Sequence, residues 1–259
     1  MSERTNDSAA TLLEVRAVSK HFGGIYALNA ASLAIRADEV HALIGPNGAG
    51  KTTLIHALSG ALALDAGQVV FAGDDLIGRP MHERVALGLA RSYQITNVFS
   101  RLSVLDNVTI AVQGRVRDWG SSFSFWKPFA LDSAIIDEAH ALLAEVSLGD
   151  FAMRRAAQLS HGQQRCLEVA LALATRPKLV LLDEPMAGMG PDESARMVDL
   201  IESLRGSVTM LLVEHDMDAV FRLADRISVM VAGRVIASDE PDVIRADPEV
   251  RRAYLGDEI

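Results

Sequence analysis

Cysteine, aromatic residues and long apolar runs are scarce in this sequence. Its single thiol, Cys166, has no second cysteine with which to form an internal disulfide, and a lone thiol of this kind is typical of a small core residue. No run of about 18 or more apolar residues is present, so no segment is predicted to span a membrane. Residues 1–10 are polar and lack the apolar region of a secretory signal, which indicates a disordered tail.

Basic residues are in the minority. The 34 acidic residues outnumber the 25 basic ones and give a formal net charge of −9, which disfavours a nucleic-acid-binding surface. With 259 residues, 49% of them hydrophobic, the chain is long enough to bury the core of one large domain or of a domain with a subdomain. These features predict a cytosolic, soluble protein that reaches a membrane only through a partner.

What the sequence does contain is an alternation of strand-like and helical patterns. The strand-like runs are 12–18, 31–36, 39–44, 68–73, 178–183, 208–213 and 226–231. Helices are predicted at 51–59, 132–148 and 191–205, and the block 81–174 is mainly helical in pattern. Strands that alternate with helices indicate an α/β fold with a mostly parallel sheet and helices on both faces. The central block looks like an inserted helical subdomain.

A glycine-rich loop stands between a predicted strand and a predicted helix. Residues 45–52, GPNGAGKT, match the phosphate-loop pattern G-x-x-x-x-G-K-[ST]. Glycines let backbone N–H groups point at phosphate oxygens, and the helix N-terminus adds partial positive charge. Lys51 is predicted to reach the β- and γ-phosphates of a nucleotide, and the Thr52 hydroxyl to ligate Mg²⁺. The predicted contacts are Gly45, Pro46, Asn47, Gly48, Ala49, Gly50, Lys51, Thr52 and Thr53. The alternative is a chance glycine turn before a helix.

Two carboxylates follow the apolar run LVLL. Asp183 ends the predicted strand and is placed to hold Mg²⁺, and Glu184 is placed to polarise an attacking water. His215 follows the next strand, so one strand–helix–strand unit is expected to bring it beside Asp183 at the same sheet edge, where it would contact the γ-phosphate. The alternatives are a surface acid pair and a structural histidine.

A further motif, LSHGQ at 159–163, opens a helical pattern. It resembles the LSGGQ signature of ATP-binding-cassette (ABC) ATPases, and the ordered set of motifs extends the resemblance over nearly the whole chain after the tail. In that family two cassettes face each other head to tail, which implies that Ser160, Gly162 and Gln163 contact ATP bound to a partner chain. The alternative is an ordinary capped helix with Ser160 as its N-cap.

The resemblance also implies a fold and its division. The core would be a P-loop NTPase (RecA-like) fold with a mostly parallel sheet and an N-terminal antiparallel β part. Residues 11–259 would form a single ABC ATPase domain, with a catalytic core at 11–93 and 176–259 and a helical signature subdomain at about 95–175.

Other positions match the family or depart from it. Phe22 corresponds to the aromatic residue that stacks on adenine, and Gln94 to the glutamine that contacts Mg²⁺ or the attacking water, with residues 95–101 after it facing a membrane partner. His161 replaces the first glycine of the signature. Gly190 stands where many members have an aspartate, which predicts weaker or asymmetric coupling between two ATP sites.

Within the family, the chain is most similar in its motifs to the ATP-binding subunits of branched-chain amino acid importers, the LivG type. The motifs are ARSYQ (90–94), GQQRCLEVA (162–170), LLDEPMAGMGP (181–191), VEHDM (213–217) and VRRAYLG (250–256). This resemblance implies ATP and Mg²⁺ as cofactors, two integral membrane permease subunits, and a second ATP-binding subunit, identical or homologous. It also implies an indirect solute-binding protein outside the membrane, no nucleic acid, and a location at the cytoplasmic face of the cell membrane.

Several alternatives stay open. Similar cassettes serve urea or amide uptake, and others belong to lipid or lipopolysaccharide exporters. A soluble ABC protein of DNA repair or translation is disfavoured by the acidic charge and the absence of a second cassette, and a simple P-loop kinase would not need residues 159–165. The segment 116–129 holds both tryptophans and several phenylalanines. It is predicted either to pack on the helical subdomain or to contact a membrane subunit or the bilayer.

Overall fold

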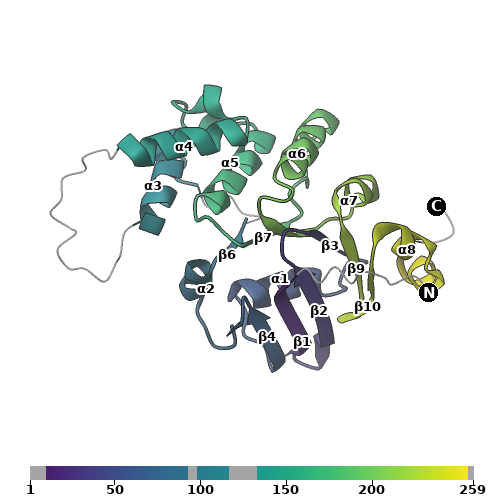
Figure 1. Cartoon of the computed structure of the whole chain (residues 1–259). Helices are drawn as coiled ribbons and strands as arrows, with labels where there is room; N and C mark the ends of the chain where they lie inside the picture. Colours follow the sequence, from purple (N-terminus) through teal and green to yellow (C-terminus); the bar gives the residue numbers. More distant parts are fainter. Residues whose placement is uncertain (1–9, 93–97, 117–132, 256–259) are drawn as a thin grey trace, which may run out of the picture. The chain divides into compact units, whose positions relative to one another are not determined.

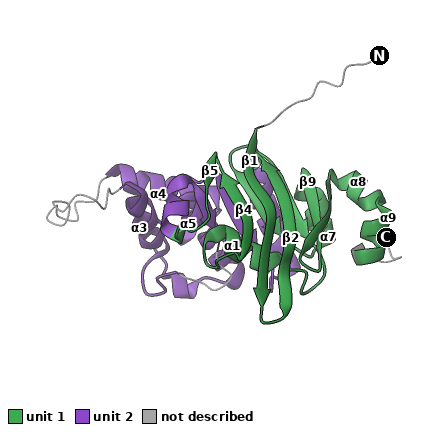
Figure 2. Cartoon of the chain, turned by 90° about the horizontal axis from the view of Figure 1, so that it is seen from below, with its two compact units in different colours: residues 1–81, 205–259 green, residues 82–204 purple. Residues whose placement is uncertain are grey.

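The computed structural model describes residues 10–92, 98–116 and 133–255, with side chains as far as residue 253. The chain divides into two compact units (Figure 2). The first combines residues 1–81 with 205–259, and the second is 82–204. Figure 1 labels the helices and strands of both. Within the described ranges, no helix has the length and apolar character needed to cross a membrane.

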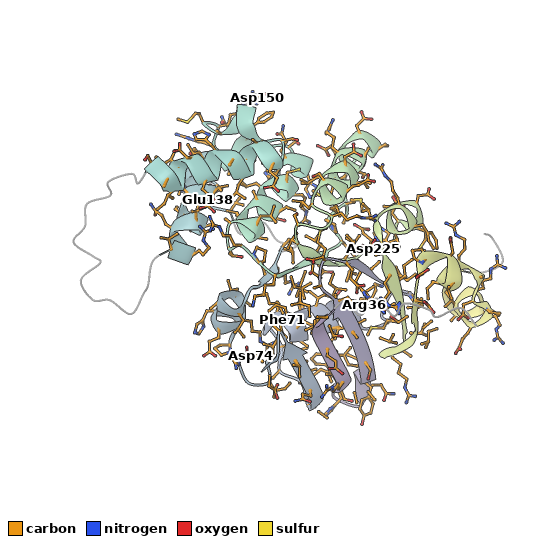
Figure 3. The ribbon with its side chains drawn as sticks, in the orientation of Figure 1. Arg36, Phe71, Asp74, Glu138, Asp150 and Asp225 are labelled. Carbon is orange, nitrogen blue, oxygen red and sulfur yellow. The ribbon has the colours of Figure 1, made fainter. Side chains whose placement is uncertain are left out.

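The first unit begins with an antiparallel sheet. Its strands are β1 (Thr11–Phe22), β2 (Ile25–Arg36), β4 (Ala66–Phe71) and β5 (Asp74–Asp75), in the spatial order β2-β1-β4-β5. β4 passes close to β1 at Gly67, where φ is +96° and an added Cβ would lie 2.5 Å from Val18 Cα, so a residue without a side chain is required. Phe71, labelled in Figure 3, is fully buried at the end of β4.

A mostly parallel sheet completes the first unit. Its strands are β3 (Val40–Ile44), β8 (Thr209–Val213), β9 (Arg226–Val231) and β10 (Arg234–Asp239). β3 pairs in parallel with β8 and β9, and β10 adds antiparallel to β9. Every residue of β3 and β8 is buried, as expected of parallel strands covered on both faces. The helices are α1 (Lys51–Ser59), α7 (Met217–Leu223), α8 (Pro241–Ala246) and α9 (Pro248–Val250), with a π-helical turn at Arg251–Leu255.

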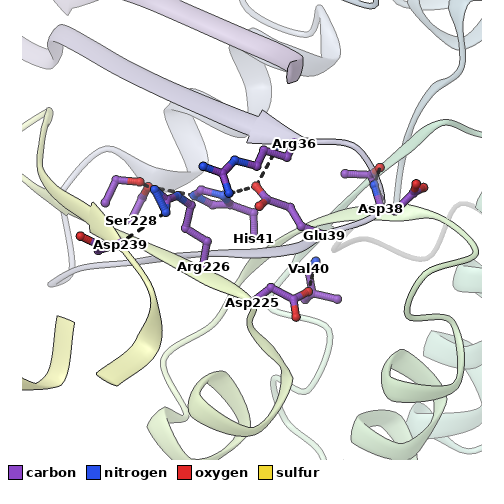
Figure 4. A network of polar contacts seen from close by, with 11 residues as sticks. Arg36, Asp38, Glu39, Val40, His41, Asp225, Arg226, Ser228 and Asp239 are labelled. Carbon is purple, nitrogen blue, oxygen red and sulfur yellow. Dashed lines mark hydrogen bonds and ion pairs between the residues drawn. The ribbon is translucent and has the colours of Figure 1, made fainter. Parts of the chain in front are cut away.

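A buried polar network lies within this sheet (Figure 4). His41 is fully buried, with Nδ1 2.9 Å from Glu39 Oε1 and Nε2 2.8 Å from Ser228 Oγ. Ser228 Oγ is in turn 2.8 Å from Ser238 Oγ, and Arg36 N donates to Glu39 Oε1 at 2.9 Å. Because buried polar groups cost stability unless they are hydrogen-bonded, this network ties the start of β3 to β9 and β10.

The second unit combines a strand pair with a group of helices. β6 (Leu89–Arg91) pairs in parallel with β7 (Leu179–Asp183), whose residues are all buried. The helices are α2 (Met81–Leu87, which begins at the boundary between the units), α3 (Val104–Val116), α4 (Ser133–Glu145), α5 (His161–Leu173) and α6 (Pro191–Ser203). Short 3-10 helices at Gly149–Phe151 and Ala156–Gln158 lie between α4 and α5.

One arginine joins three of these helices. Arg115 on α3 donates through both terminal nitrogens to the carboxylate of Glu138 on α4, at 2.7 and 2.8 Å, and Nη1 also donates to Ala174 O after α5 at 2.8 Å. Glu138 is labelled in Figure 3. The hydrogen bond from Arg115 lowers the pKa of the Glu138 carboxyl below its ordinary value. This bidentate pair orients α3 against α4 beside the C-terminal end of α5.

The α/β prediction is confirmed, with local differences. The helix 51–59 is found as predicted, whereas the one predicted to reach 205 ends at Ser203 and the one predicted at 132–148 is α4, Ser133–Glu145. β6 interrupts the block predicted to be helical, because a strand of three residues is too short to show alternation. The tail 1–9, Gln94 and residues 117–129 of the aromatic segment fall outside the described residues, so those predictions stand as they were.

Candidate nucleotide site

The phosphate loop leaves β3 and ends where α1 begins. Gly45 and Gly50 have φ values of +152° and +108° and lie against backbone of other strands. A Cβ added at Gly45 would lie 2.0 Å from Met230 O, and one added at Gly50 would lie 2.3 Å from Ala27 O. Any side chain would collide there, so glycine is required at both positions for the loop to take this course.

The Lys51 side chain folds back over the loop. Its Nζ donates to Gly45 O at 2.6 Å and to Pro46 O at 3.1 Å. The side chain is half-buried, whereas Thr52 beside it is exposed. An ammonium group donates up to three hydrogen bonds and can exchange carbonyl acceptors for phosphate oxygens. A cation over the loop and a helix N-terminus behind it fit an anionic phosphate group.

An exposed apolar turn joins β1 to β2. Phe22, Ile25 and Tyr26 are 53%, 76% and 59% exposed. A patch of this kind is typical of a surface that takes a ligand or partner, and a flat aromatic ring suits a stacked base. The next residue of β2, Ala27, is the one against which Gly50 packs, so the strand runs from the turn directly to the phosphate loop.

His215 follows β8 and is accessible. Its side chain is 65% exposed, and its Nδ1 lies 3.8 Å from Oε2 of Glu214, which is buried. The same carboxylate oxygen accepts from His215 N at 3.1 Å. Asp216 then begins α7 by accepting from the backbone N–H groups of Asp218 and Ala219. Both flanking residues therefore hold the backbone around His215 while its ring stays open to a ligand.

In the second unit, Asp183 ends β7 next to a cation. Arg91 on β6 donates from Nη2 to Asp183 Oδ2 at 3.1 Å, and the two side chains are only 6% and 1% exposed. Carboxylate and hydroxyl oxygens are donors that Mg²⁺ prefers. In the described part of the chain, no group of three or more His, Cys, Asp and Glu side chains could hold a metal ion.

Glu184 has an unusual backbone conformation. Its φ is +51°, in the left-handed region that residues other than glycine rarely adopt. Ala187 N donates to Glu184 O at 3.1 Å, which closes the turn between β7 and α6, and the side chain is half-buried. Backbone strain of this kind costs about 1–3 kcal/mol and clusters at functional sites.

The signature residues begin α5. Ser160 is the N-cap, its Oγ accepting from Gln163 N at 3.3 Å while Gln163 Oε1 accepts from Ser160 N at 3.0 Å. The cap geometry of an ordinary helix is therefore present at the signature. Ser160 Oγ also donates to Glu193 Oε1 on α6 at 2.9 Å. His161 is exposed, and its Cε1 would lie 3.6 Å from a Cβ added at Gly188.

The predicted residues fall into two sets. Phe22, residues 45–53 and His215 belong to the first unit, and Asp183, Glu184 and the signature residues 160–163 belong to the second. His215 and Asp183 belong to different units, so the expectation that they lie side by side stays a prediction.

Three residues with direct contacts to the predicted set were given no role by the sequence. Glu214 directly precedes His215 in VEHDM, and Arg91 stands three residues before Gln94 in ARSYQ, so their charges within these motifs were a sequence signal. Glu193 carried no such signal, because it lies 33 positions from Ser160 and only the packing of α6 brings it near.

Comparisons with known proteins agree with the resemblance in the motifs. Residues 28–187 match the family described as ABC transporter, and residues 234–259 match the family described as branched-chain amino acid ATP-binding cassette transporter. The chain is 37% identical over 251 residues to the high-affinity branched-chain amino acid transport ATP-binding protein BraF of Pseudomonas aeruginosa, covering 95% of this chain and 98% of that protein. It is 36% identical over 250 residues to LivG of Escherichia coli K12, the corresponding transport ATP-binding protein, with the same coverage.

Solved structures agree on the fold. The chain superimposes on the ADP conformation of an ATP-binding cassette of an ABC transporter with a TM-score of 0.82 and 30% identity, covering 96% of this chain and 100% of that one. A nucleotide-free cassette from an ABC transporter gives a TM-score of 0.81 and 29% identity. The predicted P-loop NTPase fold is thereby confirmed.

Proposed function

This chain belongs to the ABC transporter family of ATP-hydrolysing cassettes, and from that premise we propose that it powers an importer of branched-chain or related amino acids. The proposal is carried by its identity of 37% and 36% to the BraF and LivG transport proteins over 95% of its length. The C-terminal match over residues 234–259 supports the same assignment. The choice of solute would lie with the membrane and solute-binding partners.

The nucleotide is proposed to bind first through its phosphates. Residues 45–53 would surround them with backbone N–H groups, and Lys51 would exchange its two carbonyl acceptors for oxygens of the β- and γ-phosphates. The exposed ring of Phe22 would stack on the adenine.

Hydrolysis is proposed to use the residues that follow β7 and β8. Thr52, Gln94 and Asp183 would hold Mg²⁺, which when bound neutralises developing charge on the phosphates. Arg91 holds the Asp183 carboxylate in place. Glu184 would orient the attacking water and accept its proton, and the exposed ring of His215 would contact the γ-phosphate.

The working unit is proposed to be a pair of cassettes. Ser160, Gly162 and Gln163 would close over ATP bound to a second ATP-binding subunit, identical or homologous, arranged head to tail. A serine hydroxyl and the N-terminus of a 13-residue helix suit a γ-phosphate. The pair would sit at the cytoplasmic face of the membrane beneath two permease subunits, which receive solute from a binding protein on the other side.

Affinity purification of this chain from its native membranes, with mass spectrometry of the co-purified proteins, tests the proposal. Two permease subunits and a second cassette are expected. Soluble partners alone would contradict the transport role, and a lipid-exporting or urea-importing complex would redirect the assignment of substrate.

A further inference from the structure

The signature serine is already engaged within its own chain. Ser160 Oγ donates to Glu193 Oε1 at 2.9 Å, and Glu193 stands in the first turn of α6. We propose that Glu193 is an intrachain latch: it occupies the signature serine in the unpaired cassette and must leave before the phosphate of a partner's ATP can bind there. This inference rests on the proposed function, in which Ser160 binds that phosphate.

The Ser160 hydroxyl cannot bind Glu193 and a phosphate oxygen at the same time, because of its limited hydrogen-bonding capacity. A serine hydroxyl has one proton to donate and two lone pairs to accept. The proton goes to Glu193, and one lone pair accepts from Gln163 N. A phosphate oxygen is an acceptor and needs that same proton. It would also meet the negative charge of the carboxylate, so Ser160 cannot serve both anions.

The carboxylate also lies where the phosphate is expected. A Cβ added at Gly162 would lie 2.8 Å from Glu193 Cδ and 2.9 Å from Glu193 Oε1. The acid is therefore packed over the first turn of α5, where helix N–H groups and the helix dipole favour an anion. Glycine at 162 leaves the space that this acid fills, so the Glu193 carboxylate occupies the position proposed for the phosphate of the partner's ATP.

A place for the released side chain lies one helical turn away. Arg196 follows Glu193 at the spacing of neighbours on a helix surface, and both line a cavity of about 650 Å³ that also includes Ser160 and Gly162. Rotation about the side-chain bonds of Glu193 would move its carboxylate away from Ser160 and towards the Arg196 guanidinium. Arg196 would thus favour release, and Glu193 would favour the latched state.

The test measures ATP-driven self-association of the full chain by sedimentation, in a Glu184→Gln background that is expected to retain ATP. Glu193→Ala should lower the ATP concentration for half-maximal association about tenfold, since a competing charged hydrogen bond is removed. Glu193→Gln keeps an oxygen that can accept from Ser160 but removes the charge. Its ATP concentration for half-maximal association should lie between those of the parent and Glu193→Ala. Arg196→Ala should raise the required concentration.

Asp192→Ala is the matched control. It removes the same charge one residue earlier in the first turn of α6 and should behave like the parent. A purely structural role for Glu193 would change the melting temperature and would not give opposite signs for Glu193→Ala and Arg196→Ala. Equal ATP requirements for the parent and Glu193→Ala would overturn the latch.

A second measurement decides the case in which the chain pairs only with a different subunit. Inorganic phosphate is titrated into the Lys51→Ala chain, whose phosphate loop has lost its cation, and the Gly162 and Gln163 amides are followed by NMR. Binding should be about tenfold tighter when Glu193 is also alanine. Equal binding, or none in either chain, refutes the latch. ATP binding to the chain with Lys51 intact is measured separately, so a failure of the proposed function is distinguished from a failure of the latch.

Discussion

Individual residues at the candidate site depend on their local backbone. Glu184 is the clearest case, because its φ of +51° is strained for a residue with a side chain and immediately follows the buried Asp183. We expect Glu184→Gln to retain ATP binding and to lower steady-state hydrolysis at least about 100-fold, the usual contribution of a general base. Phosphate release and equilibrium ATP binding measure the two effects. Glu202→Gln on α6 is the control, and near-normal turnover of Glu184→Gln would remove the proposed role.

Gly190 offers a second prediction for a single residue. It is the N-cap of α6 without a side-chain cap, and an added Cβ would meet no atom within 4 Å. Gly190→Asp should therefore fit and stabilise the chain by about 0.3 kcal/mol, the usual gain of an aspartate N-cap over glycine. If the missing aspartate weakens coupling between paired sites, the cooperativity of ATP hydrolysis should rise as well. Unchanged cooperativity at the higher melting temperature would count against that coupling.

Cys166 should be chemically inert. Burial raises the pKa of its thiol to about 11, against about 8.5 for an exposed cysteine. At pH 7 its thiolate fraction, and so its alkylation by iodoacetamide, should be at least about 100-fold lower than for the urea-unfolded chain. The rate should rise with pH towards about 11, as mass spectrometry of the alkylated chain can follow. Equal rates in the folded and unfolded chains would show that the thiol is not protected.

At the scale of elements, Glu39 and His41 add a polar side-chain link to the pairing of β3 with β9. Burial raises the pKa of Glu39, but hydrogen bonds from His41 and from Arg36 N outweigh it, so the net pKa is lowered. A lowered pKa stabilises the fold above the unfolded pKa of about 4.3, and this contribution is lost as pH falls through the folded value. Arg226 adds a smaller attraction in the same direction.

Glu39→Gln should therefore cost about 1–3 kcal/mol of unfolding free energy at pH 7. The deficit should shrink as pH falls below about 4, because the parent loses its charged carboxylate there. Urea unfolding at several pH values measures both. Asp38→Asn, at the exposed turn before β3, is the matched control. A deficit that stays constant down to acid pH would mean that Glu39 acts by packing alone.

For the whole molecule, ATP should stabilise the fold through Lys51. A ligand that binds only the native state adds about 2.7 kcal/mol at a concentration 100 times its Kd. The parent should therefore melt several degrees higher with saturating ATP and Mg²⁺, and Lys51→Ala should lose most of this shift. Lys178→Ala, the control, removes an exposed positive charge before β7 and should retain the ATP-induced rise in melting temperature. An equal ATP shift in the parent and in Lys51→Ala would exclude the proposed contact.

Much of this protein was determined by sequence because it depends on local order. The strand, glycine loop and helix around Lys51 are consecutive, and the apolar run before Asp183 predicts a buried strand that ends in a carboxylate. The motif LSHGQ, which opens a helical pattern, predicts the start of α5, and Ser160 is its N-cap. Periodicity and spacing are properties of neighbouring residues, so they can be read without coordinates.

Only the tertiary structure decided which distant polar side chains meet. Arg91 and Asp183 are 92 positions apart, Ser160 and Glu193 are 33 apart, and His41 and Ser228 are 187 apart. Each contact requires two elements to be packed with hydrogen-bonding accuracy, and no local pattern encodes that register. Sequence order therefore determined which chemistry the chain carries, and long-range packing brought Arg91 to Asp183 and Glu193 to Ser160.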